Sequence, residues 1–521
     1  MKRRITFIQG PAAPFDPHQA ILSSNSFAVR NLDAAAEDRI TITTDQDKLP
    51  LELRKVFDQS QELHIRWATE QPFDALAPFA SRVSPGLHVH YTPRISNQSS
   101  DALCDLLRTM FGAEEGNGVD CMIPKDSFTT PPPLSAQFAA STELQYYTRL
   151  PTLQHLVAFI RNIICHDHEC DAMAGSLHTA DSVDIDYDRA SRTLTASVFW
   201  STPPVGGWEE DIKKPASTVD KVEVGILGAE PNVTPDEIKM GGLLGVVGED
   251  KKLKPTMFSF PSRHHPLAES AKYSISFSQP TGLHPEMSIS IPHSALDRPP
   301  APLDATCALH TYLTLPSSVF LDQYQVSTTD PLFLKEHNLV SLRAFSGETD
   351  LEAPDWAVEL WGSTWLFELA TPSTTENGDP ASNWTSTIPL HLRYLKPSQS
   401  GYRSAHVPWP VVFWACVSDD QSKMGLNPFD RTNLGYDGLF GPRTLFYQLH
   451  PASEQLVEEL SVPVLELEDG QGLFQSRNIE IGTSIVIVLG FLWILTKLIR
   501  VVWATGFEAN EVRGPDHEKK E

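Results

Sequence analysis

The sequence predicts a mainly β protein with a β-sandwich-like domain next to a membrane, a mixed α/β N-terminal region and one C-terminal transmembrane helix. Apolar and polar residues alternate along many short segments, and 41 prolines and 29 glycines punctuate the chain. This pattern is typical of strands joined by turns. Near the C-terminus, one long apolar segment contains only two charged residues. With 521 residues, the chain has room for two or three domains.

The long apolar segment runs from Ile481 to Val502. About 20 residues of helix rise about 30 Å, which matches the hydrocarbon core of a bilayer. Lys497 and Arg500 lie at one end, where their long side chains reach the headgroups. No second segment of this kind occurs in the sequence. We therefore predict a transmembrane helix over 481–502 and a cytosolic tail over 503–521, and we do not expect this chain alone to form a multi-helix pore.

The N-terminal region, residues 1–200, shows both strand and helix periodicity. One helix pattern begins after Ser100 or Asp101, which are good N-caps, and ends at Gly112. Residues 201–281 are rich in Gly, Pro and Lys, so we expect a linker-like region with short strands and a turn at Gly241-Gly242. The expected N-terminal elements are strands over 63–67 and 87–91, helices over 103–110 and 153–164, and a hairpin over 183–198.

Alternation is cleaner in residues 282–475, for which we predict a β-sandwich. The segment 411–417 is apolar on both faces, as expected for a central strand. The expected strands are 287–291, 309–315, 356–360, 365–369, 388–394 and 411–417.

The net charge and the cysteine count restrict the possible partners and bonds. A formal net charge of −25 argues against binding to nucleic acid or to anionic lipid. The six cysteines allow disulfides without forming a disulfide-dense scaffold. In an oxidising compartment, bonds between Cys165 and Cys170 and between Cys307 and Cys416 are candidates, while free buried thiols are the alternative for most of the six.

The charges that flank the predicted span indicate its orientation. Glu466, Glu468, Asp469 and Glu480 precede the span, and basic residues follow it. By the positive-inside rule, the tail is expected in the cytosol and the body in the lumen. The N-terminus lacks the apolar stretch of a usual signal peptide, so a tail-anchored protein with a cytosolic body is the alternative. Three N-glycosylation sequons, at Asn97, Asn232 and Asn383, permit the lumenal orientation.

Two clusters of polar residues are candidates for chemistry. The segment 166–170, His-Asp-His-Glu-Cys, has zinc ligand types, but a polar exposed loop explains it better. Asp184, Asp186 and Asp188 resemble the start of a calcium loop or a glycosyltransferase DxD, yet the calcium loop's Gly and Glu are missing, so a solvated strand face is favoured. The sequence has no GxSxG or HExxH motif. We predict no catalytic, cofactor-binding or metal-binding residues, and hence a binding or scaffolding protein rather than an enzyme.

Several blocks in the second half of the chain occur in an order that resembles a known family. The segment that starts at Ile388 reads IPLHLRYLKP, and the one that starts at Val407 reads VPWPVVFWAC. Together with the blocks before them, these resemble the PIG-X family, and more closely its fungal branch, the protease-B-nonderepressible proteins. The earlier blocks are GLHPE at 282, HTYLTLPSSVFLDQYQ at 310 and LEAPDW at 351, and looser similarities are MKRRITF at 1 and ELHIRW at 62.

The resemblance implies a function. Members are single-pass ER membrane proteins with a lumenal body that act as the non-catalytic, stabilising subunit of GPI mannosyltransferase I. The catalytic partner is a multispanning PIG-M-like protein, which transfers the first α-1,4-linked mannose from dolichol-phosphate-mannose to the GPI precursor. An ER chaperone with its own clients is the alternative, and a lumenal transferase that uses Asp184 and Asp186 is a third hypothesis.

Large aromatics of the β domain are candidate partner contacts, because such residues dominate interface energies. A place in the sandwich core is the favoured interpretation for each. In the span, Gly490 is a position where a partner helix is able to approach closely. The aromatic candidates are Trp361, Trp365, Trp409 and Trp414.

Overall fold

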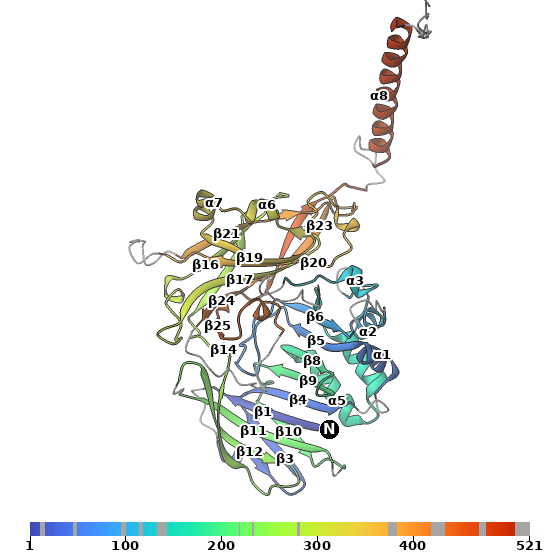
Figure 1. Ribbon diagram of the computed structural model, residues 1–521. Coiled ribbons are helices and arrows are strands. Elements are labelled where there is room, and N and C mark those ends of the chain that lie inside the picture. The colour runs from blue at the N-terminus through green and yellow to red at the C-terminus, as the bar shows by residue number, and fades with distance from the viewer. Residues whose placement is uncertain are drawn as a thin grey trace, which may run out of the picture. The chain divides into compact units, whose positions relative to one another are not determined.

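The computed structural model contains two compact units, which we describe separately. One comprises Met1–Leu395 with Ser404–Leu460, and the other Lys396–Arg403 with Ser461–Glu521. The described residues are 1–10, 16–44, 49–94, 101–113, 118–132, 143–217, 219–231, 234–278, 282–372, 383–417, 433–467 and 476–505. Strands dominate the first unit (Figure 1), which confirms the prediction of a mainly β protein.

A ten-stranded sheet forms the N-terminal part of the first unit, in the order β13-β12-β11-β1-β4-β9-β8-β5-β6-β7. The first strand of the chain, β1, lies inside this sheet, parallel to β11 and antiparallel to β4 (Figure 1). A small sheet of order β10-β3-β2 accompanies it. The strands are β1 (Lys2–Gln9), β2 (Ala20–Leu22), β3 (Ser26–Leu32), β4 (Ala35–Thr43), β5 (Ser60–Ala68), β6 (Gly86–Pro93), β7 (Leu144–Thr148), β8 (Ser182–Asp188), β9 (Thr193–Trp200), β10 (Trp208–Lys213), β11 (Lys221–Glu230), β12 (Glu237–Val246) and β13 (Lys254–Pro261).

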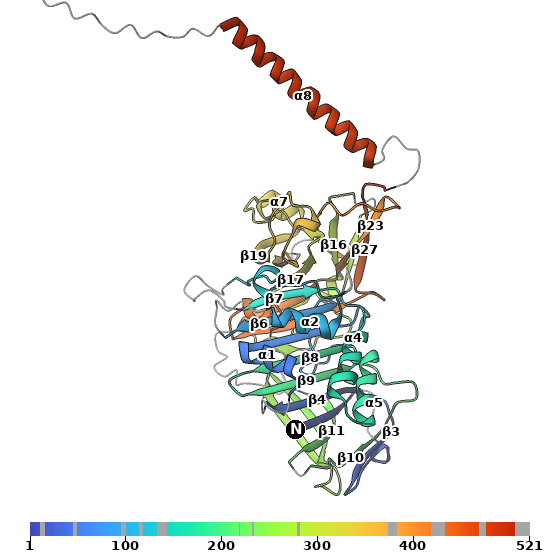
Figure 2. The same ribbon diagram turned by 90° about the vertical axis from the view of Figure 1, so that its right-hand side faces the viewer.

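Helices lie in front of this sheet in the view of Figure 2. In α2 (Ala102–Phe111), Leu103, Leu107 and Met110 are buried, and the helix ends at Gly112, whose φ of 85° favours glycine. Both predicted helices of this region are present, although the second continues from α4 as a π-helical turn over Ile160–Ile164. The other helices are α1 (Leu51–Gln59), α3 (Pro124–Ser127), α4 (Gln154–Phe159) and α5 (His168–Ser176).

The structure differs from our expectation for residues 201–281. Three strands of this region, β11 to β13, extend the ten-stranded sheet, so most of the region is not an extended connection. Gly241 and Gly242 lie within β12 rather than in a turn. A Cβ atom on Gly242 would lie 2.1 Å from the carbonyl oxygen of Ile226, so the glycine permits close pairing of β11 and β12. The boundaries that we assign to the domains stay predictions.

The region that starts at residue 282 contributes to a six-stranded sheet, β14-β25-β24-β17-β20-β19, and to a four-stranded sheet, β21-β16-β15-β26. As predicted, β24 is an inner strand, and its residues from Val411 to Cys416 are buried. The strands of the two sheets are β14 (His264–His265), β15 (Lys272–Phe277), β16 (Glu286–Ile291), β17 (Thr306–Pro316), β19 (Leu339–Gly347), β20 (Gly362–Leu369), β21 (Trp384–Pro389), β24 (Val411–Val417), β25 (Thr444–Gln448) and β26 (His450–Pro451).

Two predicted strands in this region are wrong. The expected strand 388–394 is interrupted, because β21 ends at Pro389, only His391–Leu392 pairs beyond it, and Tyr394 is exposed. Residues 356–360 do not form a strand, because Asp355–Ala357 is a 3-10 turn after Pro354 and Trp356 is 53% exposed. Three apolar residues at alternate positions do not by themselves separate a strand from such a turn. The remaining elements are two ribbons, β18 (Val319–Phe320) with β22 (His391–Leu392) and β23 (Tyr402–Pro408) with β27 (Val457–Pro463), and the short helices α6 (Gln323–Val326) and α7 (Pro331–Glu336).

The second unit contains α8 (Ser476–Thr505), a continuous helix that includes the predicted span. Among the described residues, Arg477–Trp503 is the one helical segment long and apolar enough to cross a membrane. Its 30 residues correspond to about 45 Å at 1.5 Å per residue. Residues 506–521 of the predicted tail lie outside the described residues.

Candidate functional sites

The aspartates of the DxD segment lie on β8, on the sheet face opposite Val183 and Tyr187. Asp184 is buried and accepts a hydrogen bond of 2.7 Å from Arg66 of β5. The guanidinium of Arg66 is also buried, and its Nε donates to the carbonyl of Asn433. Our interpretation of this segment as a solvated strand face is therefore wrong for Asp184, because on this face its partner Arg66 also packs against the backbone of Asn433.

Asp186 belongs to the same cluster. A ring N–H of His64 donates to Asp186 over 2.7 Å, and Glu62 lies 3.8 Å from the other ring nitrogen. Burial alone would lower the pKa of His64, but these two carboxylates outweigh it and raise the pKa to about 9. Arg66 lies 3.5 Å from Asp186 as well. Both aspartates of the DxD segment thus contact cationic side chains, an arrangement that stabilises the fold and competes with binding of a metal ion.

The segment 166–170 forms the start of α5. Asp167 caps the helix by accepting a hydrogen bond from the backbone N–H of Cys170. Cys170 is bonded to Cys165, so its sulfur is not a thiolate ligand. Within the described ranges, no group of three or more His, Cys, Asp or Glu side chains is arranged to hold a metal ion. His168 and Glu169 instead line a pocket beside β1 and β4.

All six cysteines form disulfides, and both candidate bonds are present. The expectation of free buried thiols is therefore wrong. The third bond joins Cys104 of α2 to Cys121, a pair that we did not single out; the even number of cysteines was its only signal.

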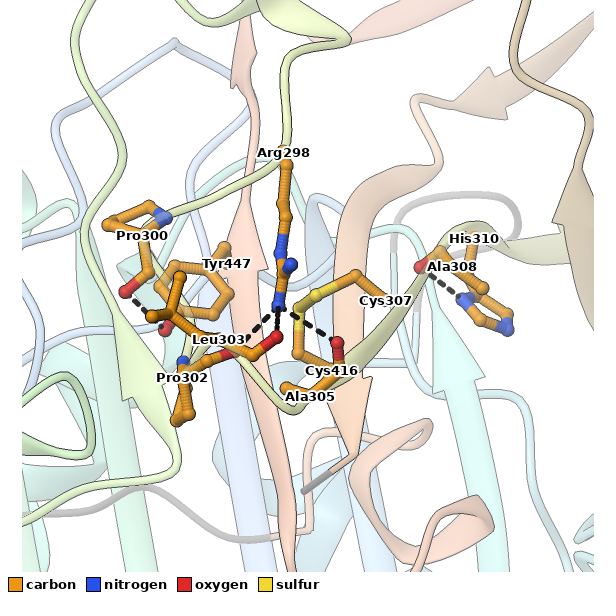
Figure 3. The surroundings of a disulfide bond; sticks show 10 residues. All are labelled: Arg298, Pro300, Pro302, Leu303, Ala305, Cys307, Ala308, His310, Cys416 and Tyr447. Atoms are coloured by element: carbon orange, nitrogen blue, oxygen red, sulfur yellow. Dashed lines mark hydrogen bonds between the residues drawn. A yellow bond between two sulfur atoms is a disulfide. The ribbon is translucent and has the colours of Figure 1, made fainter. Parts of the chain in front are cut away.

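The Cys307–Cys416 bond links β17 to its neighbour β24. Figure 3 shows Arg298 beside this bond, where it donates to the carbonyl groups of Pro302, Leu303 and Ala305 over 2.6 to 3.2 Å. The disulfide and Arg298 together fix the loop that leads into β17.

Hydrogen bonds connect the N-terminal region to the region after residue 282. Trp361 donates from its indole to the carbonyl of Gln145, whose side-chain amide donates to the hydroxyl of Tyr312. Gln448 exchanges hydrogen bonds with the backbone of Arg82. The two regions therefore share a polar, largely buried interface inside one compact unit.

The four tryptophans that we considered as partner contacts are buried. Trp365 is completely buried and Trp361 belongs to the core beneath the helices of the N-terminal region. Burial of all four is confirmed, but Trp361 packs in the core of the N-terminal region and not in the predicted sandwich core. None of the four offers an exposed contact; the set is Trp361, Trp365, Trp409 and Trp414.

Of the three sequons, only Asn383 lies in a described segment. It is exposed just before β21, and its side-chain amide donates to the hydroxyl of Ser290 over 3.1 Å. Asn97 and Asn232 lie outside the described residues. Glycosylation of these sites stays a prediction.

Comparison with known proteins identifies the family. A family model described as PIG-X / PBN1 matches residues 280–499. The chain is 55% identical to Protein pbn1 of Aspergillus oryzae over 97% of each chain. It is also 55% identical to Protein pbn1 of Emericella nidulans over 100% of both chains, and 53% identical to Protein pbn1 of Aspergillus fumigatus over 97% and 96%.

The chain belongs to the PIG-X/PBN1 family. The resemblance that we noted in the sequence, including its fungal branch, is confirmed. The fungal PBN1 relatives match the N-terminal region as well as the region after residue 282, because the matches to Aspergillus proteins cover nearly the full chain. The residues that form the ten-stranded sheet therefore lie within the part of the chain that these relatives match.

Proposed function

We propose that this PIG-X/PBN1 family member is the non-catalytic, stabilising subunit of GPI mannosyltransferase I in the ER membrane. Family membership points to GPI-anchor biosynthesis, and this single finding carries the proposal. The partner is a PIG-M-like multispanning mannosyltransferase. That partner transfers the first α-1,4-linked mannose from dolichol-phosphate-mannose to the GPI precursor, and the present chain keeps it folded and abundant.

The geometry of the polar cluster supports an accessory role. A transferase of the DxD type needs carboxylates that are able to hold a divalent metal ion. Asp184 instead accepts from Arg66, and Asp186 from His64. Replacing Asp184 and Asp186 by Asn is expected to lower stability without removing mannosyltransferase activity at equal protein amount; loss of activity from a well-folded variant would favour the transferase hypothesis.

Depletion of the chain in a fungal host tests the role in GPI biosynthesis. If the chain is a mannosyltransferase I subunit, glucosaminyl-phosphatidylinositol without mannose accumulates and the amount of the catalytic partner falls. A chaperone for unrelated clients, the alternative function, leaves that lipid at its normal level while the clients misfold. Normal precursor levels after depletion would overturn the proposal.

The contribution of α8 is tested by replacing Ile481–Val502 with an unrelated apolar span of equal length. We expect less of the catalytic partner, because helix packing through positions such as Gly490 would be lost. A matched variant, Gly490→Leu in the native span, tests close approach at that position. Unchanged partner and mannosylation in both variants would reduce α8 to an anchor.

The proposed topology places the body in the ER lumen and the tail in the cytosol. Endoglycosidase H digestion of the full chain tests it, with Asn97, Asn232 and Asn383 each changed to Gln. A mobility shift that the substitutions abolish supports a lumenal body. Protease sensitivity of the body in intact microsomes, without any shift, would instead mean a cytosolic body.

A further inference from the structure

A pocket of about 430 Å³ lies on the helix-covered face of the ten-stranded sheet. Its floor comes from β1, β4 and β9, and α5 and β10 form its sides; Figure 2 shows α5 next to these strands. This volume is within the range of small-molecule sites, about 300–1,000 Å³. The proposed subunit function makes no use of this pocket.

Aromatic side chains form part of the pocket. Trp200 and Trp208 meet edge to face with ring centroids 5.7 Å apart, and Phe7 lies 6.0 Å from Trp208. Trp208 is held in place by a hydrogen bond of 2.8 Å from its indole to the carbonyl of Ala34. Trp200 is 8% exposed, and its indole N–H has no acceptor in the part of the chain that the structure describes. A buried donor of this kind is costly unless something accepts from it.

Charged groups of both signs stand beside the tryptophans. Arg3 donates to both carboxylate oxygens of Asp38 over 2.7 to 3.1 Å, which fixes the guanidinium in one orientation. Burial alone would lower the pKa of Arg3, but Asp38 and two further carboxylates raise it above its usual value. These are Glu169 of α5 and Glu210 of β10, which come from opposite sides of the pocket.

This combination determines which ligand chemistry fits. Carboxylates outnumber Arg and Lys side chains in the lining, which disfavours a phosphate or another anion; they are Glu37, Asp38, Glu169, Glu210 and Asp211, against Arg3 and Lys213. The guanidinium, which remains charged, works against a simple cation. A neutral polyhydroxylated ring is compatible with both, because each hydroxyl is able to donate to a carboxylate and to accept from Arg3. The C–H bonds on one side of a sugar ring also form an apolar face that matches an indole surface.

We propose that this pocket is a carbohydrate-binding site. The ring of a neutral sugar lies against Trp200 and Trp208, and its hydroxyls are bound by Arg3, Glu169 and Glu210. None of its residues belongs to the DxD cluster. It gives the N-terminal region a ligand-binding role in addition to the proposed subunit function.

Saturation-transfer NMR on the full chain in phosphatidylcholine nanodiscs tests the proposal. Nanodiscs are needed because detergents with sugar headgroups would compete for the site. The probes are methyl α-mannoside, methyl α-glucoside and chitobiose, with N-acetyl-lysine amide as the cationic probe. We expect saturation transfer to the ring protons of at least one sugar, and none above background for the lysine probe.

Two variants and two matched controls give the expected result its specificity. Glu210→Ala and Trp208→Leu should each weaken sugar binding about tenfold or more, as expected for loss of a charged hydrogen-bond partner or a stacking surface. Glu209→Ala alters the next residue of β10, which does not line the pocket, and Trp356→Leu alters an exposed tryptophan elsewhere; both should bind as the unmodified chain does. Glu210→Ala decides the question where Trp208→Leu fails to fold.

Three outcomes would overturn the proposal. The first is the absence of saturation transfer to every sugar probe beyond that seen with empty nanodiscs. The second is sugar binding that Glu210→Ala leaves unchanged. The third is binding of the lysine probe alone, which would make the pocket a site for a cationic side chain of another polypeptide.

Discussion

The two large sheets differ in where they keep their polar residues. The ten-stranded sheet has an apolar face beneath its helices and, at β5 and β8, an opposite face with a buried ion pair between Arg66 and Asp184. In the six-stranded sheet, the inner strand β24 is apolar on both faces and carries a disulfide to β17. Stability of the first sheet therefore depends in part on charge pairing, and that of the second on packing and a covalent link.

Removing the disulfides is expected to give the largest contrast. Cys307 and Cys416 are 109 residues apart, against 17 for Cys104–Cys121 and 5 for Cys165–Cys170. In the chain-entropy model, losing these bonds lowers the free energy of unfolding by about 5, 3 and 2 kcal/mol respectively. Urea denaturation of the full chain, with each pair changed to Ala, measures the three losses. An equal loss for all three pairs would contradict the model for this protein.

Core packing in the six-stranded sheet predicts a slightly smaller effect. Trp365 is completely buried, stacks on Phe345 and donates from its indole to the hydroxyl of Ser363. Trp365→Ala should lower the free energy of unfolding by about 3 to 5 kcal/mol. Trp356→Ala is the control, because that side chain is 53% exposed and a change within about 0.5 kcal/mol is expected. Similar losses for the two variants, in denaturation experiments, would refute the contrast.

The buried ion pair tests the other half of the comparison. Arg66→Met leaves the carboxylate of Asp184 buried without its guanidinium, so we expect a loss of about 3 kcal/mol. The double variant Arg66→Met with Asp184→Leu should lose less, because the uncompensated charge is gone as well. As a control, Lys221→Met breaks an exposed pair with Glu249 and should cost at most about 1 kcal/mol. Additive losses in the double variant would mean that the pair is not coupled.

Alternation predicted several strands of both sheets, as at 63–67 and 309–315, but the same pattern failed at 356–360 and extended too far at 388–394. It did not reveal that the polar positions of β5 and β8 are buried, because alternation shows which residues share a face but not what covers that face. The sequence also did not predict the full length of β11 and β12. Their glycines permit close strand pairing, but in the sequence they look like turn residues. The pocket beside α5 was beyond reach for a similar reason: Arg3, Trp200 and Glu210 are far apart in sequence.

The pH dependence of stability offers the subtlest test of charge pairing in the N-terminal sheet. The pKa of His64 is raised from 6.5 to about 9 in the folded chain, because hydrogen bonds to Asp186 and Glu62 outweigh burial and the nearby charge of Arg66. A pKa that folding raises favours the folded state fully below pH 6.5, and this stabilisation disappears as the pH rises toward 9. The difference between the two pKa values corresponds to a contribution to the free energy of unfolding of at most about 3 kcal/mol. Because Asp186 is partly exposed, solvent screening reduces this contribution to about 2 kcal/mol.

His64→Gln should therefore lower stability below pH 6.5 and remove most of the decline between pH 6.5 and about 9. His88 does not interfere in this range, because burial lowers its pKa to about 3 and its effect, a loss of stability as the pH falls, is confined to values below pH 6.5. His178→Gln, a change at an exposed histidine, is the control and should decline with pH as the unmodified chain does. Urea denaturation at both ends of the range measures the difference. If His64→Gln declined as steeply as the control, the ion pairs of this face would contribute little to the fold, and packing would dominate both sheets alike.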